Sequence, residues 1–375
     1  MPVIFELFGY PLSDQSLEAQ QNRQRALCPF MGEECDGGGN RELSRVDLTR
    51  NSDLRTAFSQ HPGNTVAAGV CSIQVVEGAS PWIVCPRRLL SLGRESAGVR
   101  SYQGKTEAIV LNYLSYPPGT RLGVWPEVKI KSIATINGVQ KLIDYTFDYI
   151  VMPVGSVLLD SVANLFPNIT YRRLLASLNR AGYTLSQKGG IVYIEDFPMG
   201  IPSIVEIMTS STSGGNKRTR TTISAAFEDA MLGVPHQAPG INYRQVWARM
   251  VSQLIVKSEF ALGWGGKTLW IVQDKLLEYI NSSTALTLKT FLSDNVSDVN
   301  MLSFSYSSMH QAPTGVIDLA DSQLYAGPIS SVPPELAATL PPSIQDITRA
   351  PFLPPLETLI ALLAARAPVN QVVAP

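Results

Sequence analysis

The sequence has no surplus of positive charge and no long apolar run. Its 30 Lys and Arg residues are offset by 31 Asp and Glu residues, which gives a formal net charge of −1. No stretch of about 18 uncharged apolar residues occurs, so we expect no membrane-spanning helix. The first residues also lack the basic and apolar pattern of a secretory signal, so we expect a cytoplasmic protein. Hydrophobic residues make up 45% of the chain, enough for a sizeable core.

The balanced charge gives no support for nucleic-acid binding, which usually leaves a basic footprint. Any contact with DNA must therefore come from local basic patches. Arg87 and Arg88 belong to one patch, Lys217 and Arg218 to a second, and Arg172–Arg173 form a further pair. Such pairs are usually solvated surface. We take Arg87, Arg88, Lys217 and Arg218 as candidate DNA contacts.

Cysteine is scarce and confined to the first quarter of the chain. The four cysteines are Cys28, Cys35, Cys71 and Cys85, and prolines follow Cys28 and Cys85. Proline fixes tight turns, which suit four thiolates that converge on one ion. Disulfides are disfavoured in the cytoplasm, and four unrelated buried thiols remain the alternative. The sequence thus predicts a structural metal site, and four thiolates accept either zinc or iron.

The pattern of turns and apolar segments divides the chain into three parts. Residues 1–100 are rich in turns and are expected to form a small N-terminal metal-binding module. Residues 101–325 alternate strand-like and helix-like segments, which predicts an α/β core. Residues 326–375 form a Pro-rich C-terminal tail with one short helix, expected at 356–366.

Within the core, apolar spacing predicts particular elements. Strands are expected at 141–152, 190–194, 204–208 and 267–272, and helices at 157–178, 243–260 and from 274 onward. Two of the strands carry an acid among apolar residues, namely Asp148 and Glu206. Ionised carboxylates in such strands are costly unless a cation pairs with them. Carboxylates on neighbouring strands can hold the Mg²⁺ that phosphodiester hydrolysis requires.

Two points of this predicted catalytic site are open. Asp196 precedes Glu206 by a spacing typical of a hairpin, so it is a rival to Asp148 as the first acid. In metal-dependent nucleases with an Asp on one strand and a Glu on its neighbour, the residue two positions after the Glu is usually Lys or Gln. Its side chain then points to the same face of the strand as the Glu. That position is Met208 here, and a thioether donates no hydrogen bond. We expect Lys217 to supply the missing donor.

Taken in order, these segments resemble the NotI-type restriction endonucleases over roughly residues 5–280. The matching motifs are Glu6-Leu7-Phe8-Gly9, Cys28-Pro29-Phe30, Gly69-Val70-Cys71, Trp82-Ile83-Val84-Cys85-Pro86, Phe147-Asp148-Tyr149, Val205-Glu206-Ile207 and the helix from Tyr243 towards Phe260. Met208 departs from the Gln of that family, and the stretch between the two acids is longer here.

The resemblance implies a PD-(D/E)xK nuclease core, an α/β (α+β) fold with a mixed sheet flanked by helices. It also implies one iron on Cys28, Cys35, Cys71 and Cys85, and catalytic Mg²⁺ on Asp148 and Glu206. Family members act as homodimers on palindromic double-stranded DNA. The expected function is thus that of a type II restriction endonuclease, with Lys217 assisting. The alternative, prompted by Met208, is a DNA-binding protein with an inactive nuclease core.

Overall fold

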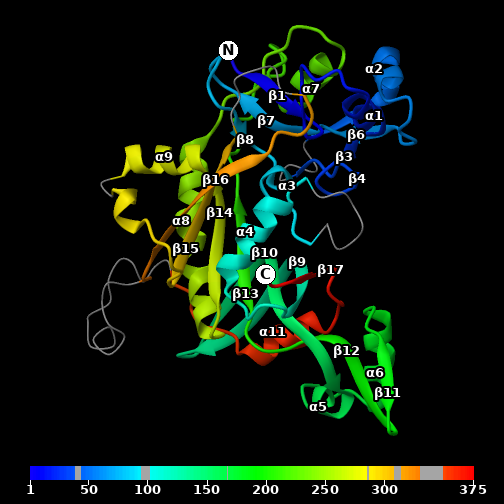
Figure 1. The fold of residues 1–375 in the computed structure, drawn as a ribbon, viewed down its shortest axis with the longest axis vertical. Coiled ribbons are helices and arrows are strands. Elements are labelled where there is room, and N and C mark those ends of the chain that lie inside the picture. Colours follow the sequence, from blue (N-terminus) through cyan, green and yellow to red (C-terminus); the bar gives the residue numbers. More distant parts are fainter. Residues whose placement is uncertain (39–43, 94–101, 167, 285–286, 308–313, 330–348) are drawn as a thin grey trace.

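The computed structural model describes residues 1–38, 44–93, 102–166, 168–284, 287–307, 314–329 and 349–375. Its centre is a nine-stranded mixed sheet with the order β11-β12-β10-β13-β14-β15-β16, in which β9 pairs with β10 and β17 pairs with β9 (Figure 1). The strands are β9 Arg121–Ile136, β10 Val139–Leu158, β11 Leu185–Lys188, β12 Ile191–Pro198, β13 Ser203–Met208, β14 Lys267–Gln273, β15 Val299–Tyr306, β16 Leu319–Gly327 and β17 Asn370–Val373. The predicted mixed α/β class is confirmed.

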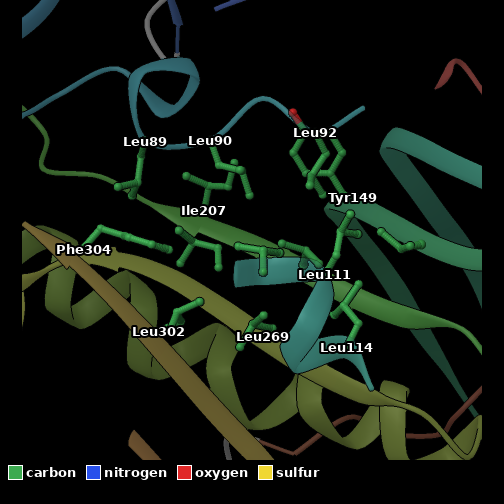
Figure 2. Packing of buried hydrophobic residues seen from close by; sticks show 14 of the residues in the cluster. Leu89, Leu90, Leu92, Leu111, Leu114, Tyr149, Ile207, Leu269, Leu302 and Phe304 are labelled. Carbon is green, nitrogen blue, oxygen red and sulfur yellow. The ribbon is translucent and has the colours of Figure 1, made fainter. Parts of the chain in front are cut away.

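Helices cover both faces of this sheet, because its central strands are apolar on both sides. Leu269 and Ile271 of β14 pack with helix α4 (Gly104–Leu114) and with the segment after α3 (Pro86–Leu89). Figure 2 shows side chains of α4 and of residues 89–92 over the strand residues Tyr149, Ile207, Leu302 and Phe304. The alternate residues Trp270 and Val272 face α8 (Tyr243–Gly263) and α9 (Asp274–Ser283). Two-sided burial explains why these strands read as nearly continuous apolar runs.

The N-terminal module has its own four-stranded sheet, with the order β2-β1-β7-β8. One helix from the middle of the chain completes the module, because Phe227 of α7 (Ile223–Met231) packs against Phe8 and Phe58. The module is therefore not a self-contained segment of sequence. Its elements are β1 Val3–Leu7, β2 Tyr10–Pro11, α1 Leu17–Arg25, β3 Leu27–Cys28, β4 Glu33–Glu34, β5 Arg45–Asp47, α2 Ser52–Ala57, β6 Thr65–Ala67, β7 Val70–Gln74 and β8 Trp82–Ile83.

Two expectations about the elements need correction. The single helix expected at 157–178 is wrong: β10 continues to Leu158, and two shorter helices follow, α5 (Leu159–Ala163) and α6 (Tyr171–Arg180). The C-terminal segment is also more than a tail. Its helix α11 (Leu356–Leu363) forms as predicted, and β17 then joins the main sheet beside β9. Among the described residues, no helix is both long and apolar enough to cross a bilayer.

A buried ion pair lies where the N-terminal module meets the core. Arg88 is 1% exposed, and its Nε lies 3.0 Å from Glu6 Oε1. Glu6 Oε2 also accepts hydrogen bonds from Tyr306 at 2.6 Å and from Ser72 at 2.8 Å, while Arg88 donates to the carbonyl of Ile317. The expectation that Arg88 contacts DNA is therefore wrong, because its guanidinium is inside the protein and already paired.

We expect Arg88→Met to lower the free energy of unfolding by about 3–5 kcal/mol, because the Glu6 carboxylate would remain buried without its cation. The exposed pair Arg50–Asp47 offers a matched control, since the Arg50 side chain is 83% exposed. Arg50→Met should change stability by less than about 1 kcal/mol. Urea titration followed by circular dichroism measures both, and equal losses would contradict the importance of the buried pair.

Candidate active site

The candidate site lies where two central strands separate. Strands β10 and β13 pair antiparallel through Tyr149–Val205, Ile150–Ile204 and Val151–Ser203. Their ladder ends there, and Asp148 and Glu206 occupy the next position on each strand. The Asp148 carboxylate accepts the backbone N–H of Ile207 at 2.8 Å, and Glu206 Oε1 accepts the N–H of Asp148 at 3.4 Å. The two acids thus replace the lost backbone pairing, which holds them next to each other.

Glu206 is buried and has a cationic partner that comes from helix α8. Lys257 Nζ lies 2.5 Å from Glu206 Oε2, and the two side chains are 4% and 3% exposed. The ammonium group also lies 5.6 Å from the ring centre of Phe147 and 5.9 Å from that of Trp270. The pair is therefore enclosed by aromatic side chains, where electrostatic interactions are weakly screened.

Burial is the main cause that raises the pKa of Glu206 to about 8, and the neighbouring Asp148 charge contributes to the same rise. The Lys257 ammonium and the Asp148 N–H act in the opposite direction, because both stabilise the carboxylate. A second cation beside Glu206 would stabilise the ionised form of its carboxyl group. Asp148 is only half-buried, so this side of the pair is the more open one.

Lys257 is the residue that sequence reasoning missed. It is 51 positions from Glu206 in the chain, so no local motif connects them. One signal was present: Lys257 lies on the apolar stripe of the predicted helix, with Met250 two turns before it and Phe260 one turn after it, and all three are buried. A lysine on a buried stripe needs a partner. The expected donor Lys217 instead lies in an exposed turn at 217–220.

Asp196, the rival first acid, lies elsewhere. It belongs to β12, which pairs with β10 only from Val154 onward, beyond the segment that pairs with β13. Its carboxylate pairs with Arg121 on β9. The structure thus brings Asp148, and not Asp196, next to Glu206.

The remaining candidate DNA contacts differ in their surroundings. Arg87 is largely buried and bridges the module and the core, with Nη2 3.3 Å from Asp36 and 3.1 Å from Glu127. Arg218 lies in the same exposed turn as Lys217. Neither turn residue is brought to the acid pair, so any role in DNA contact would be separate from the chemistry.

The four cysteines lie in one apolar cluster of the N-terminal module, and all are buried and unbridged. A hydrogen bond between the thiols of Cys71 and Cys85 raises the pKa of Cys71 and lowers that of Cys85. Burial raises the pKa of Cys28 to about 12 and that of Cys35 above its usual value, and the neighbouring sulfurs add to both shifts. The Gly9 N–H donates to Cys71 Sγ at 3.3 Å.

These features suit a thiolate site in their chemistry, since backbone donors to sulfur stabilise metal-bound thiolates. Within the part of the chain that is described, no three potential ligands converge on a common point. The four sulfurs lie in the same cluster, but they would have to move closer together to bind one ion.

Neither a family model, nor a curated protein, nor a solved structure matches this chain.

We expect Glu206→Gln to alter the pH dependence of stability in EDTA. Because the folded chain raises the pKa of Glu206 from 4.5 to about 8, it binds more protons than the unfolded chain between these values. The stability contributed by this group is therefore lost as pH rises through that window. Relative to wild type, Glu206→Gln should gain up to about 1.4 kcal/mol per pH unit.

The measurement is urea unfolding at pH 5, 6, 7 and 8, with Glu357→Gln as a control on an exposed carboxylate. Parallel profiles for wild type and Glu206→Gln would show that the Glu206 pKa is not raised.

Proposed function

We propose that this protein is a Mg²⁺-dependent endonuclease that hydrolyses double-stranded DNA, a type II restriction endonuclease of the NotI-type kind. The observation that carries the proposal is the meeting of Asp148, Glu206 and Lys257 where β10 and β13 separate. An antiparallel β9-β10-β13 unit followed by a helix and a parallel strand β14 is the order expected of a PD-(D/E)xK core. Lys257 would supply the amine that Met208 lacks.

The donor set fits magnesium, which prefers carboxylate oxygens and keeps several waters. Asp148 and Glu206 would hold the ion, and their main-chain hydrogen bonds would keep the two carboxylates in position. Bound Mg²⁺ supplies polarisation of the phosphate and a water of lowered pKa. Lys257 neutralises part of the carboxylate charge at Glu206, and its ammonium group would also stabilise negative charge that develops beside the metal.

The resemblance also leads us to propose a homodimer that cuts both strands of a palindromic site, and a structural iron on Cys28, Cys35, Cys71 and Cys85, with zinc as the alternative ion. Two-fold symmetry in the protein matches two-fold symmetry in the DNA. No catalytic step is assigned to the cysteine site, because its sulfurs belong to the N-terminal module and the acids to the central sheet.

The decisive experiment is digestion of sequenced plasmid DNA in Mg²⁺ or Mn²⁺. Asp148→Ala and Glu206→Ala should each reduce cleavage at least about 100-fold, and Lys257→Met by a comparable factor, because each removes a charge that acts on the transition state. Lys289→Met, on an exposed lysine, is the matched control and should cleave as wild type does.

Lys217→Met separates the two candidate lysines. If it lowers cleavage as much as Lys257→Met does, Lys217 is the catalytic lysine. If the wild type binds DNA but makes no nick with either ion, the inactive-core alternative replaces the proposed activity.

The metal proposal has a separate test, the metal content of the purified chain. Wild type should carry about one iron or zinc per chain. Cys71→Ser and Cys85→Ser should lose most of it and unfold at lower temperature, because a thiolate cage needs all four ligands. Met31→Leu, a volume-conserving change in the same cluster, should keep its metal. Full metal content in both serine variants would disprove the site.

A further inference from the structure

Strand β10 carries a small arm beyond the point where it leaves β13. The arm consists of α5, α6, β11 and β12, which project from the edge of the main sheet (Figure 1). It has its own apolar core, which includes Leu159, Leu174, Leu178 and Phe197. The arm is therefore a built part of the fold and not a loose connection.

Contacts at the base fix the arm relative to the sheet. Tyr183 donates to the carbonyl of Leu363 at 2.9 Å, and the N–H of Ala367 donates to Ala181 at 2.8 Å. The pair between Asp196 and Arg121 links β12 to β9. Asp196 thus has a structural place here, and its charge is already paired.

Helix α6 is amphipathic, and its outer face carries three arginines. Leu174 and Leu178 are buried in the arm, while Arg172, Arg173 and Arg180 are exposed. At 100° per residue, the three arginines fall within one 100° sector opposite the two leucines. The helix contains no acid, and no acid among the described residues lies within ion-pair distance of any of the three. Three exposed arginines on one face of a fixed helix form a local positive patch in a chain without a net positive charge.

The spacing of this face suits a nucleic-acid backbone. Arg172 and Arg180 are eight residues apart, or about 12 Å along the helix axis. One DNA strand rises about 3.4 Å per nucleotide, so this length matches three to four phosphates. Guanidinium groups bind phosphate oxygens in a bidentate manner, so an arginine-only face is suited to a phosphate backbone.

The arm is also joined directly to the strand that carries one of the acids. Asp148 and Leu158 lie on the same strand β10, and β12 of the arm pairs with the far end of that strand. One continuous strand therefore connects the acid that would hold Mg²⁺ to the base of the arm that carries the basic helix.

We propose that the face of α6 formed by Arg172, Arg173 and Arg180 binds the phosphate backbone of the duplex DNA whose cleavage is assigned to the Asp148–Glu206 pair. This inference rests on the proposed function, since it assigns a contact surface for the same substrate.

The test is fluorescence anisotropy with a labelled 30-base-pair duplex of mixed sequence, in Ca²⁺, at several salt concentrations. The full chain with Arg172→Ala, Arg173→Ala and Arg180→Ala should bind about 10- to 100-fold more weakly than wild type. Its slope of log K against log salt should be smaller by about 2–3, because each lost phosphate contact removes about 0.9. The same positions changed to Lys should keep most of the affinity.

A matched variant with Arg45→Ala, Arg50→Ala and Lys289→Ala removes the same charge from exposed positions outside the arm. It should bind within about threefold of wild type. If both triple variants lose affinity equally, the effect is one of net charge and the α6 proposal is wrong. If the α6 variant keeps the wild-type slope but changes oligomeric mass in light scattering, the face is a protein interface and the proposal is also wrong.

Cleavage in Mg²⁺ separates this inference from the proposed function. If the α6 variant binds and cleaves DNA as wild type does, the inference about α6 is overturned and the nuclease function stands. If wild type binds DNA but never cleaves it, the nuclease function is overturned. If the α6 variant loses that binding, α6 is still a DNA-binding surface.

Discussion

The separation of β10 from β13 after Tyr149 and Val205 is the constraint on which the candidate site depends. A ladder that continued would pair the backbone of Asp148 and turn its side chain to one face of the sheet. Instead the Asp148 carboxylate takes the N–H of Ile207 and its own N–H points to Glu206. The cost of unpaired backbone groups in a buried sheet explains why the two carboxylates are held so firmly. The main chain therefore fixes the two carboxylates beside each other.

Glu6 and Glu206 are both buried carboxylates that pair with a buried cation, and the comparison between them is informative. Glu6 is saturated, since Arg88, Ser72 and Tyr306 all donate to it. Glu206 has one short bond from Lys257 and one long bond from the Asp148 N–H. Burying an ion pair contributes little net stability by itself. The saturated pair is thus best understood as a joint between the module and the core, and the unsaturated pair as a site with remaining capacity for a cation.

Strand β10 connects the acid pair to the rest of the main sheet and to the arm. It pairs with β9 along its length, with β13 near the acids and with β12 at the base of the arm. The cysteine module is held to the same core by Arg88, which donates to the carbonyl of Ile317, and by Arg87, whose guanidinium reaches both Asp36 and Glu127.

The sequence by itself determined several of the local elements and pointed to the two acids. Apolar spacing identified β13, β14, α8 and the body of β10, because strand and helix periodicity are set by neighbouring residues. An acid inside an apolar strand singled out Asp148 and Glu206 for the same reason. Only the tertiary structure decided that Lys257 meets Glu206, that Arg88 is buried against Glu6, and that Asp196 serves the arm. Each of these depends on pairing between segments far apart in the chain, and local periodicity carries no information about which distant partner a charged side chain will find.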